Sequence, residues 1–204
     1  MHLTRLSLVF ACVALMQGCV SMPATPSVDQ RQGQSLYQQH LQDNADIESF
    51  SLKAKIGVQT EGKGFSGSLH WQHHANQDEI ALFSPLGGQV ASMQKNVDGI
   101  TLTDANGRIQ TAADAETLTQ NLLGWQLPLQ GLADWSLGRP HSMPIQAISL
   151  DDRGLITSLQ QDDWLISYDH YSEQNGHLLP SKMVLRSKKL TLKILIDDWD
   201  IPTH

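Results

Sequence analysis

Apolar and polar residues alternate along most of the chain between Phe50 and Asp198, with the period of two that is typical of β-strands. The clearest segment covers residues 50–59, where every second residue, beginning with Phe50, is apolar. The pattern predicts further strands at residues 65–71, 79–83, 89–95, 100–103, 108–111, 145–150, 155–161, 164–168, 182–186 and 190–198. Short turns join most of these segments, which favours an antiparallel meander over βαβ units.

Helical spacing interrupts this strand pattern once and precedes it once. Asp114 is expected to cap a helix over residues 115–123 that ends at Gly124. A second short helix is predicted from the spacing of Leu132, Trp135 and Leu137. Residues 28–45 predict a third helix that covers an edge or face of the sheet, with a short coiled-coil arm as the alternative. The fold class is therefore mainly β (α+β), with roughly eleven antiparallel strands and three helices, and a sheet that must curl to bury its apolar face.

A tight turn is predicted at Phe83-Ser84-Pro85-Leu86-Gly87-Gly88, between two of the strands. Proline fixes φ and glycine permits positive φ, so residues 85–88 suit a short, rigid connection. Leu86 lies between Pro85 and Gly87 and cannot easily fold back into either strand. We therefore expect a leucine side chain at the exposed tip of this turn, and the alternative is that Leu86 packs under the helices as core.

The N-terminus has the three parts of a secretory signal over residues 1–18: the single charge of Arg5, an apolar run, and Gly18 before Cys19. The run is shorter than the about 20 residues that a membrane-spanning helix needs. Met16-Gln17-Gly18-Cys19 resembles a bacterial lipobox, which implies that Cys19 becomes the lipidated first residue. The alternative is cleavage elsewhere with a free Cys19. Residues 19–27 are interpreted as the lipidated cysteine and a tether, and residues 28–204 as one domain.

The chain contains 40% apolar residues, enough for a core, and a formal net charge of −7 at pH 7. This acidic balance argues against binding to nucleic acid and against electrostatic docking on anionic lipid. The chain has two cysteines, and Cys12 would leave with the signal, so no internal disulfide is expected. Val20 is not aspartate, and the resemblance to the bacterial sorting rule favours release to the outer membrane.

The sequence has no HExxH, GxSxG, P-loop or glycine-rich dinucleotide motif. The adjacent pair His73-His74 would point apart in a strand or turn and could not easily share a metal. Ser66, Ser68 and the pairs of aspartates at 151–152 and 162–163 lack a catalytic partner pattern. We therefore expect no enzyme, no catalytic residue, no metal and no cofactor, and keep a hydrolase with an unrecognised site as an alternative.

An ordered set of short motifs over about residues 45–199 resembles the LolB family of outer-membrane lipoprotein receptors. The set comprises the Trp71 strand, Ser84-Pro85-Leu86-Gly87, Leu102-x-Asp104-x-x-Gly107, Ala113-Asp114-Ala115-Glu116, Leu127-Pro128-Leu129 and Trp135-x-Leu137-Gly138-x-Pro140. The resemblance implies a strongly curved, incompletely closed antiparallel β-barrel, with helices covering an apolar cavity. It also implies a lipid-anchored monomer on the periplasmic face of the outer membrane, held there by its N-terminal acyl chains. Such a protein accepts acylated lipoproteins from the carrier LolA and inserts them into that membrane without nucleotide.

The candidate site has two parts. By resemblance, Leu86 of the Pro85–Gly87 turn serves membrane insertion. The acyl-cavity candidates are apolar strand and helix residues, which are equally well explained as plain core: Phe65, Leu69, Trp71, Ile80, Leu82, Leu102, Trp135, Trp164 and Ile166. Arg108 is expected on the surface, with a polar gate at the cavity mouth as the alternative. A second function class is a lipid-anchored structural or assembly factor that binds partners through its sheet edges.

Overall fold

The computed structural model describes residues 28–75 and 77–202. The signal peptide predicted at 1–18, the lipidated Cys19 and the tether to residue 27 lie outside the described residues. Within the described part of the chain, none of the helices has both the length and the apolar character needed to cross a membrane.

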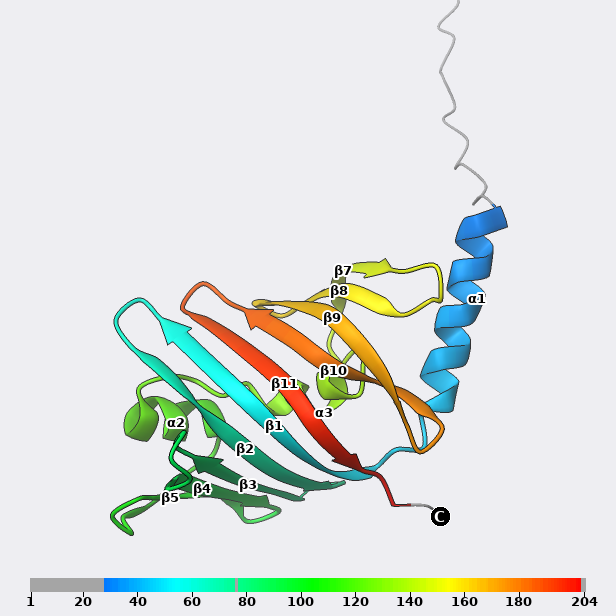
Figure 1. Ribbon diagram of the computed structural model, residues 1–204. Helices are drawn as coiled ribbons and strands as arrows, with labels where there is room; N and C mark the ends of the chain where they lie inside the picture. Colours follow the sequence, from blue (N-terminus) through cyan, green and yellow to red (C-terminus); the bar gives the residue numbers. More distant parts are fainter. Residues whose placement is uncertain (1–27, 76, 203–204) are drawn as a thin grey trace, which may run out of the picture.

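A single antiparallel sheet of 11 strands forms most of the molecule, in the order β6-β5-β4-β3-β2-β1-β11-β10-β9-β8-β7 (Figure 1). Its edge strands β6 and β7 do not pair with each other, so the curved sheet stays unclosed and the predicted fold class is confirmed. The strands are β1 (Ser49–Thr60), β2 (Gly64–His74), β3 (Gln77–Phe83), β4 (Gln89–Asn96), β5 (Gly99–Asp104), β6 (Ile109–Ala112), β7 (Ile145–Leu150), β8 (Ile156–Gln161), β9 (Trp164–Gln174), β10 (His177–Arg186) and β11 (Leu190–Asp200).

The sheet consists of two meanders that meet at the centre. Strands β1 to β6 form the first and β7 to β11 the second, and the two are joined where β1 pairs with β11 from Ser51↔Asp200 to Thr60↔Leu190. This pairing brings the first and last strands of the domain side by side. Because antiparallel neighbours alternate in direction, the β1–β2, β3–β4, β5–β6, β8–β9 and β10–β11 turns all lie at one end of the sheet, which we call the turn end.

Two helices lie on the concave side of the sheet and connect its halves (Figure 1). They are α2 (Ala115–Leu123), which contacts β5 and β6, and α3 (Leu129–Ser136), which contacts β10. Asp114 caps α2 as predicted, because its Oδ1 accepts a hydrogen bond of 2.7 Å from the backbone N–H of Thr117. Gly124 ends α2, also as predicted, and the residues up to Pro128 lead into α3.

The N-terminal helix α1 (Val28–Asp43) packs beside the second meander, outside the concave face (Figure 1). Two of its side chains, Tyr37 and His40, are buried. The helix backbone approaches the β7–β8 turn at Gly154, where a side-chain carbon would lie 2.5 Å from the backbone nitrogen of Tyr37. Glycine at 154 thus allows the helix to cover the end of the sheet.

Two strands are longer than the alternation predicted. The sequence predicted strands only at 164–168 and 182–186, whereas β9 reaches Gln174 and β10 begins at His177. The intervening residues were wrongly left out because they are polar and because Pro180 lacks the backbone N–H that a sheet ladder requires. The structure accommodates Pro180 at register shifts between β9 and β10. Trp199 donates its Nε1–H to the backbone carbonyl oxygen of Pro180 at 3.3 Å.

Candidate functional site

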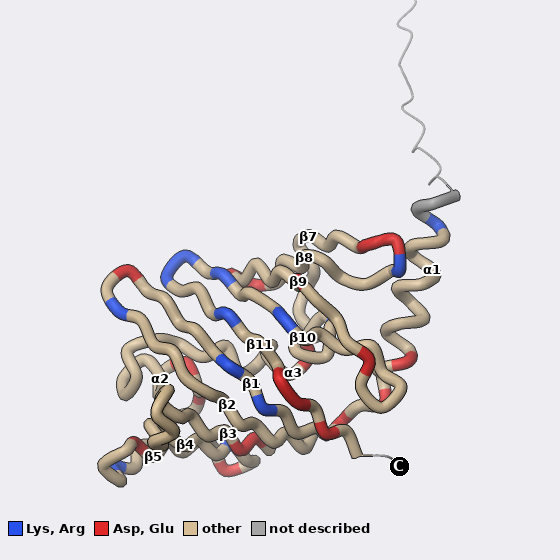
Figure 2. The backbone as a smooth tube through the Cα atoms, in the orientation of Figure 1, with Lys and Arg blue, Asp and Glu red and all other residues tan. Residues whose placement is uncertain are grey.

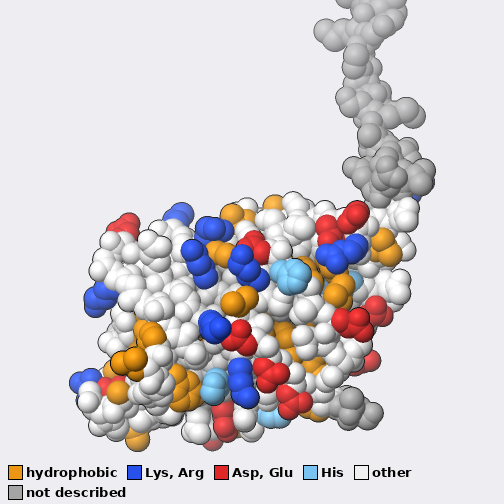
Figure 3. All heavy atoms as spheres, in the orientation of Figure 1, with side chains coloured by type: hydrophobic (Ala, Val, Ile, Leu, Met, Phe, Trp, Pro, Cys, Tyr) orange, Lys and Arg blue, Asp and Glu red, His pale blue; other side chains and the backbone are white. Residues whose placement is uncertain are grey.

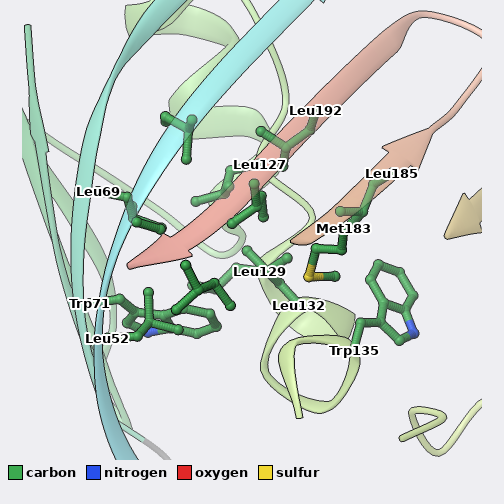
Figure 4. Close-up of a cluster of buried hydrophobic side chains, with 14 of the residues drawn as sticks. Leu52, Leu69, Trp71, Leu127, Leu129, Leu132, Trp135, Met183, Leu185 and Leu192 are labelled. Atoms are coloured by element: carbon green, nitrogen blue, oxygen red, sulfur yellow. The ribbon is translucent and has the colours of Figure 1, made fainter. Parts of the chain in front are cut away.

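The concave face of the sheet is filled by apolar side chains from both halves of the sheet and from the α2–α3 region (Figure 4). Strands β1 and β2 contribute Leu52, Leu69 and Trp71, and strands β10 and β11 contribute Met183, Leu185 and Leu192. From the helical side, the contributors are Leu127, Leu129, Leu132 and Trp135. All of these side chains are buried, so both the sheet and the helical side contribute apolar groups to the interior. We call the segment from Trp125 to Trp135, which covers the concave face, the helical wall.

The predicted cavity residues divide into two groups. Phe65 and Trp164 are partly buried, pack against the core and each line a pocket at the turn end of the sheet. The structure brings the others together as fully buried members of one apolar cluster: Leu69, Trp71, Ile80, Leu82, Leu102, Trp135 and Ile166. These seven residues are core in this structure.

Two of the candidate tryptophans are fixed by hydrogen bonds to the sheet. Trp71 donates its Nε1–H to Asp78 Oδ1 at 2.9 Å, and Trp135 donates its Nε1–H to Gln161 Oε1 at 3.0 Å. Tyr168 adds a hydrogen bond of 3.0 Å from its hydroxyl to the backbone oxygen of Trp135. Because these polar groups are satisfied inside the protein, both rings are rigid walls of the interior.

Asp78 is a buried carboxylate with three partners at the end of β3. Besides Trp71, it contacts His73 Nδ1 at 2.7 Å and Lys95 Nζ at 3.3 Å. Burial raises the pKa of Asp78, but the hydrogen bonds from His73 and Trp71 and the nearby positive charges outweigh it and hold the pKa below its ordinary value. The structure thus gives His73 a structural role, because its ring contacts the buried carboxylate of Asp78.

A pocket of about 440 Å³ lies at the turn end, between the β1–β2 turn, the β10–β11 turn and the α2–α3 connection. Its apolar lining includes Trp125, Trp164 and Leu190, and its polar lining includes Glu61 and Lys189. The ring centroid of Trp164 is 6.4 Å from that of Trp135, which belongs to the buried interior. One wall of the pocket therefore lies next to the side chains that fill the concave face.

The helical wall is held unequally at its two ends. Beyond α3, Arg139 donates to Asp134 Oδ1 at 2.7 Å and to the backbone oxygen of Asn44 at 2.7 Å, which ties this end to the α1–β1 connection. At the pocket end, Thr119 Oγ1 accepts a hydrogen bond of 2.9 Å from the N–H of Leu127 within the same helical region. A charged anchor to the rest of the fold thus secures the α3 end, and a local neutral bond shapes the pocket end.

The turn that carries Leu86 also lies at the turn end. Its frame is closed by hydrogen bonds from the N–H of Ser84 to Gly88 O at 2.8 Å and from the N–H of Gly87 to Ser84 O at 2.9 Å. Gly87 has a φ of +85°, a conformation that glycine adopts without strain. Leu86 is 98% exposed, so the alternative in which it packs as core does not describe this structure.

Close packing against β2 sets the position of that turn. Phe83 pairs with Ser68, and a side-chain carbon at the neighbouring Gly67 would overlap the carbonyl oxygen of Phe83.

Arg108, in the β5–β6 turn, is exposed and donates its Nε–H to Asp104 Oδ2 at 2.6 Å, which agrees with the expected surface position.

Sequence reasoning missed several residues of the interior. Leu52 and Leu192 could have been found, because they lie on the apolar faces of strands that were correctly predicted. Met183 and Leu185 were inside a predicted strand but were not recognised as interior. The local sequence predicted only helical structure around Leu127, Leu129 and Leu132. It does not show which face of the sheet a short helix covers.

The comparisons with known proteins agree with this architecture. The sequence profile described as "LolB: Outer membrane lipoprotein LolB" matches residues 48–199. A relative from Nitrosomonas europaea named "Outer-membrane lipoprotein LolB" is 32% identical over 197 residues, covering 95% of this chain and 91% of the relative. A protein of the same name from Pseudomonas savastanoi pv. phaseolicola is 30% identical over 192 residues, covering 94% of each chain.

Two solved structures share the fold at low sequence identity. A DUF1329 family protein from Desulfovibrio piger superposes with a TM-score of 0.55 at 9% identity, covering 85% of this chain and 93% of that chain. A LolA superfamily protein from Nitrosomonas europaea gives a TM-score of 0.51 at 8% identity, covering 84% and 94%. With the profile match over most of the described residues and relatives at 30% identity or more, the chain belongs to the LolB family of outer-membrane lipoproteins.

Proposed function

We propose that this protein is an outer-membrane lipoprotein receptor that accepts acylated lipoproteins from the carrier LolA and inserts them into the outer membrane. The observation that carries the proposal is the apolar concave face, covered by one helical segment that borders a pocket at the turn end. In this proposal residues 1–18 are removed, an acylated Cys19 and the tether to residue 27 hold the protein on the membrane, and residues 28–204 work as a monomeric domain. Its role is transport of lipoproteins, without a catalytic step or a cofactor.

The energetics of acyl chains make a sheltered route necessary. Each methylene removed from water contributes about 0.8 kcal/mol, so exposing even one long acyl chain costs on the order of 10 kcal/mol. A client that moves from one apolar interior to another and then into lipid avoids this cost. The transfer then needs only a downhill order of affinities, with no nucleotide.

Entry of an acyl chain requires the helical wall to move, because Leu127, Leu129 and Leu132 occupy the concave face. The Arg139 anchor holds the end beyond α3, so we propose that the wall opens at the pocket end. The acyl chain then replaces leucine side chains against the same apolar sheet. An unclosed sheet can widen to accept it, since β6 and β7 are not joined.

Release into the membrane is assigned to the turn that contains Leu86. The side chain is 98% exposed on a hydrogen-bonded frame, and the fold gains nothing from leaving a leucine there. Dipping into the lipid surface would remove this apolar area from water and would set the pocket at the same end of the sheet against the bilayer.

A two-step transfer assay tests the function. Mature protein in vesicles is mixed with carrier loaded with an acylated client, and the client is followed from carrier to receptor to vesicle lipid. We expect transfer of the acylated client and none of the same client lacking its acyl chains. Equal binding of both clients would contradict the proposal and would favour an assembly factor that recognises protein through its sheet edges.

A further inference from the structure

Positive charge gathers at one place in this acidic protein. Of the 14 Lys and Arg residues in the chain, five exposed ones lie around the β1–β2 and β10–β11 turns. We call this set the basic rim, and it consists of Lys63, Arg186, Lys188, Lys189 and Lys193. Figure 2 marks the Lys and Arg positions in blue along the backbone, and Figure 3 shows blue side chains over the upper left and centre of this face, with red ones mainly toward its right.

The pairing of β1 with β11 assembles the basic rim. Thr60 pairs with Leu190, which places the β1–β2 turn with Lys63 next to the β10–β11 turn with Lys188 and Lys189. Arg186 and Lys193 flank that second turn on the exposed surface of β10 and β11. Residues more than a hundred positions apart in the chain therefore form one surface, which borders the pocket through Lys189.

The basic rim is not neutralised within the protein. None of its five members belongs to an ion pair in the part of the chain that the structure describes. On the same face but farther from the turn end, Lys53, Lys55 and Lys182 each pair with an aspartate. Acidic residues do occur at the turn end, at Glu61, at Asp104 and in the β8–β9 turn, but none of them forms an ion pair with a member of the basic rim in the described structure.

Exposed acidic residues concentrate at the other end of the sheet. They lie at the end of α1, in the α1–β1 connection, in the β4–β5 and β7–β8 turns and at the end of β11: Asp43, Asp46, Glu48, Asp98, Asp152 and Asp200. Strand β1 has 12 residues, so the two ends are separated by about 40 Å at roughly 3.3 Å per residue. The net charge of −7 is therefore unevenly distributed, and the domain has one basic end and one acidic end.

We propose that the basic rim binds the anionic headgroups of phospholipids and so turns the pocket and Leu86 toward the target bilayer. The inference deepens the proposed delivery function and rests on it. A lipid surface is favoured over an acidic protein because a fully exposed leucine lies at the same end, and interfacial binding combines an apolar insertion with cations against anionic lipid. The overall acidity argued against such docking, and the separation of charge reverses that expectation for this end.

The distance dependence of the attraction fits an orienting role. Charges are screened beyond about 8 Å at physiological ionic strength, so the basic rim acts only when it is close to the headgroups. At that distance the acidic end lies about 40 Å away, outside the range of repulsion. Turned the other way, the domain would present its acidic residues to the anionic surface and would be repelled.

The orientation can be measured on the mature, lipid-anchored protein in vesicles that contain nitroxide-labelled phosphatidylcholine. A fluorophore is placed at Ala105→Cys in the β5–β6 turn at the basic end, or at Val97→Cys in the β4–β5 turn at the acidic end. We expect quenching at residue 105 only, in vesicles with about one third phosphatidylglycerol but not in pure phosphatidylcholine. The variant with Arg186→Gln, Lys188→Gln and Lys193→Gln should lose this quenching and should deliver client at least about tenfold more slowly.

The matched control removes three charges from the same face of strands β1 and β10, which flank β11, with Lys53→Gln, Lys55→Gln and Lys182→Gln, and should keep the orientation and the delivery rate. Equal losses in both variants, or unchanged quenching in the rim variant, would overturn the proposal. If the rim variant keeps its orientation but no longer takes client from the carrier, the basic rim binds an acidic protein instead of lipid. If the wild-type protein delivers no client, the proposed function fails, while the quenching still decides the orientation.

Discussion

Leu86→Glu is the sharpest test of how the client leaves the protein. The side chain is 98% exposed, and substitutions at such positions change the free energy of unfolding by no more than about 0.5 kcal/mol. For a protein of this size that corresponds to a shift of the melting midpoint by less than about 2 °C. If Leu86 were core, a buried glutamate would instead cost several kcal/mol, or roughly 10 °C.

The expected effect on delivery is much larger than the effect on stability. Burying a leucine side chain in lipid contributes about 1.5–3 kcal/mol, which corresponds to roughly a 10- to 150-fold change in membrane engagement. The carboxylate also opposes contact with an anionic surface. Uptake from the carrier should stay within about twofold of wild type, because nothing in the concave face changes.

The assay compares three variants by thermal unfolding, client uptake and delivery to vesicles. Leu86→Met keeps an apolar tip and should deliver client almost normally. Val97→Glu is the matched control, since Val97 is 87% exposed in a turn at the opposite end of the sheet. Delivery by Leu86→Glu at the wild-type rate, or an equal loss in Val97→Glu, would refute membrane insertion by this turn.

Three further predictions concern the parts that hold the site in place. Gln161→Leu should lower the free energy of unfolding by roughly 1–3 kcal/mol in chemical denaturation, because buried Trp135 Nε1 loses its acceptor; a loss below about 0.5 kcal/mol would contradict this. Gly67→Ala should cost about 1–3 kcal/mol and slow delivery, since the new methyl group displaces Phe83 and the turn that follows; unchanged melting and delivery would show that the close contact is unimportant. Asp78 should stabilise the fold above its unfolded pKa of about 3.9 and lose this contribution as pH falls through its lower folded pKa. The free energy of unfolding of Asp78→Asn should therefore fall less than that of the wild type as the pH is lowered. Parallel curves for the two proteins would refute the assignment.

Local patterns in the sequence were sufficient for the elements and for the turn that exposes Leu86. A period of two marks a strand with one buried face, and Asp114 and Gly124 mark the ends of a helix through hydrogen bonds within a few residues. The Pro85–Gly87 turn is local in the same sense, because its conformation follows from the permitted φ of its own residues. Where local signals conflicted, as at Pro180 in β10, the prediction was wrong, and neighbouring strands decided the outcome.

Only the tertiary structure decided what these elements surround and which charges lie together. The pairing of β1 with β11 depends on contacts between the two ends of the domain, which no short pattern encodes, and this pairing creates the basic rim from separate turns. The helices could have covered either face of the sheet, and their packing placed Leu127, Leu129 and Leu132 inside the concave one. Burial and Coulomb interactions depend on distance in space, so composition yields the net charge, whereas the fold determines where each charge acts.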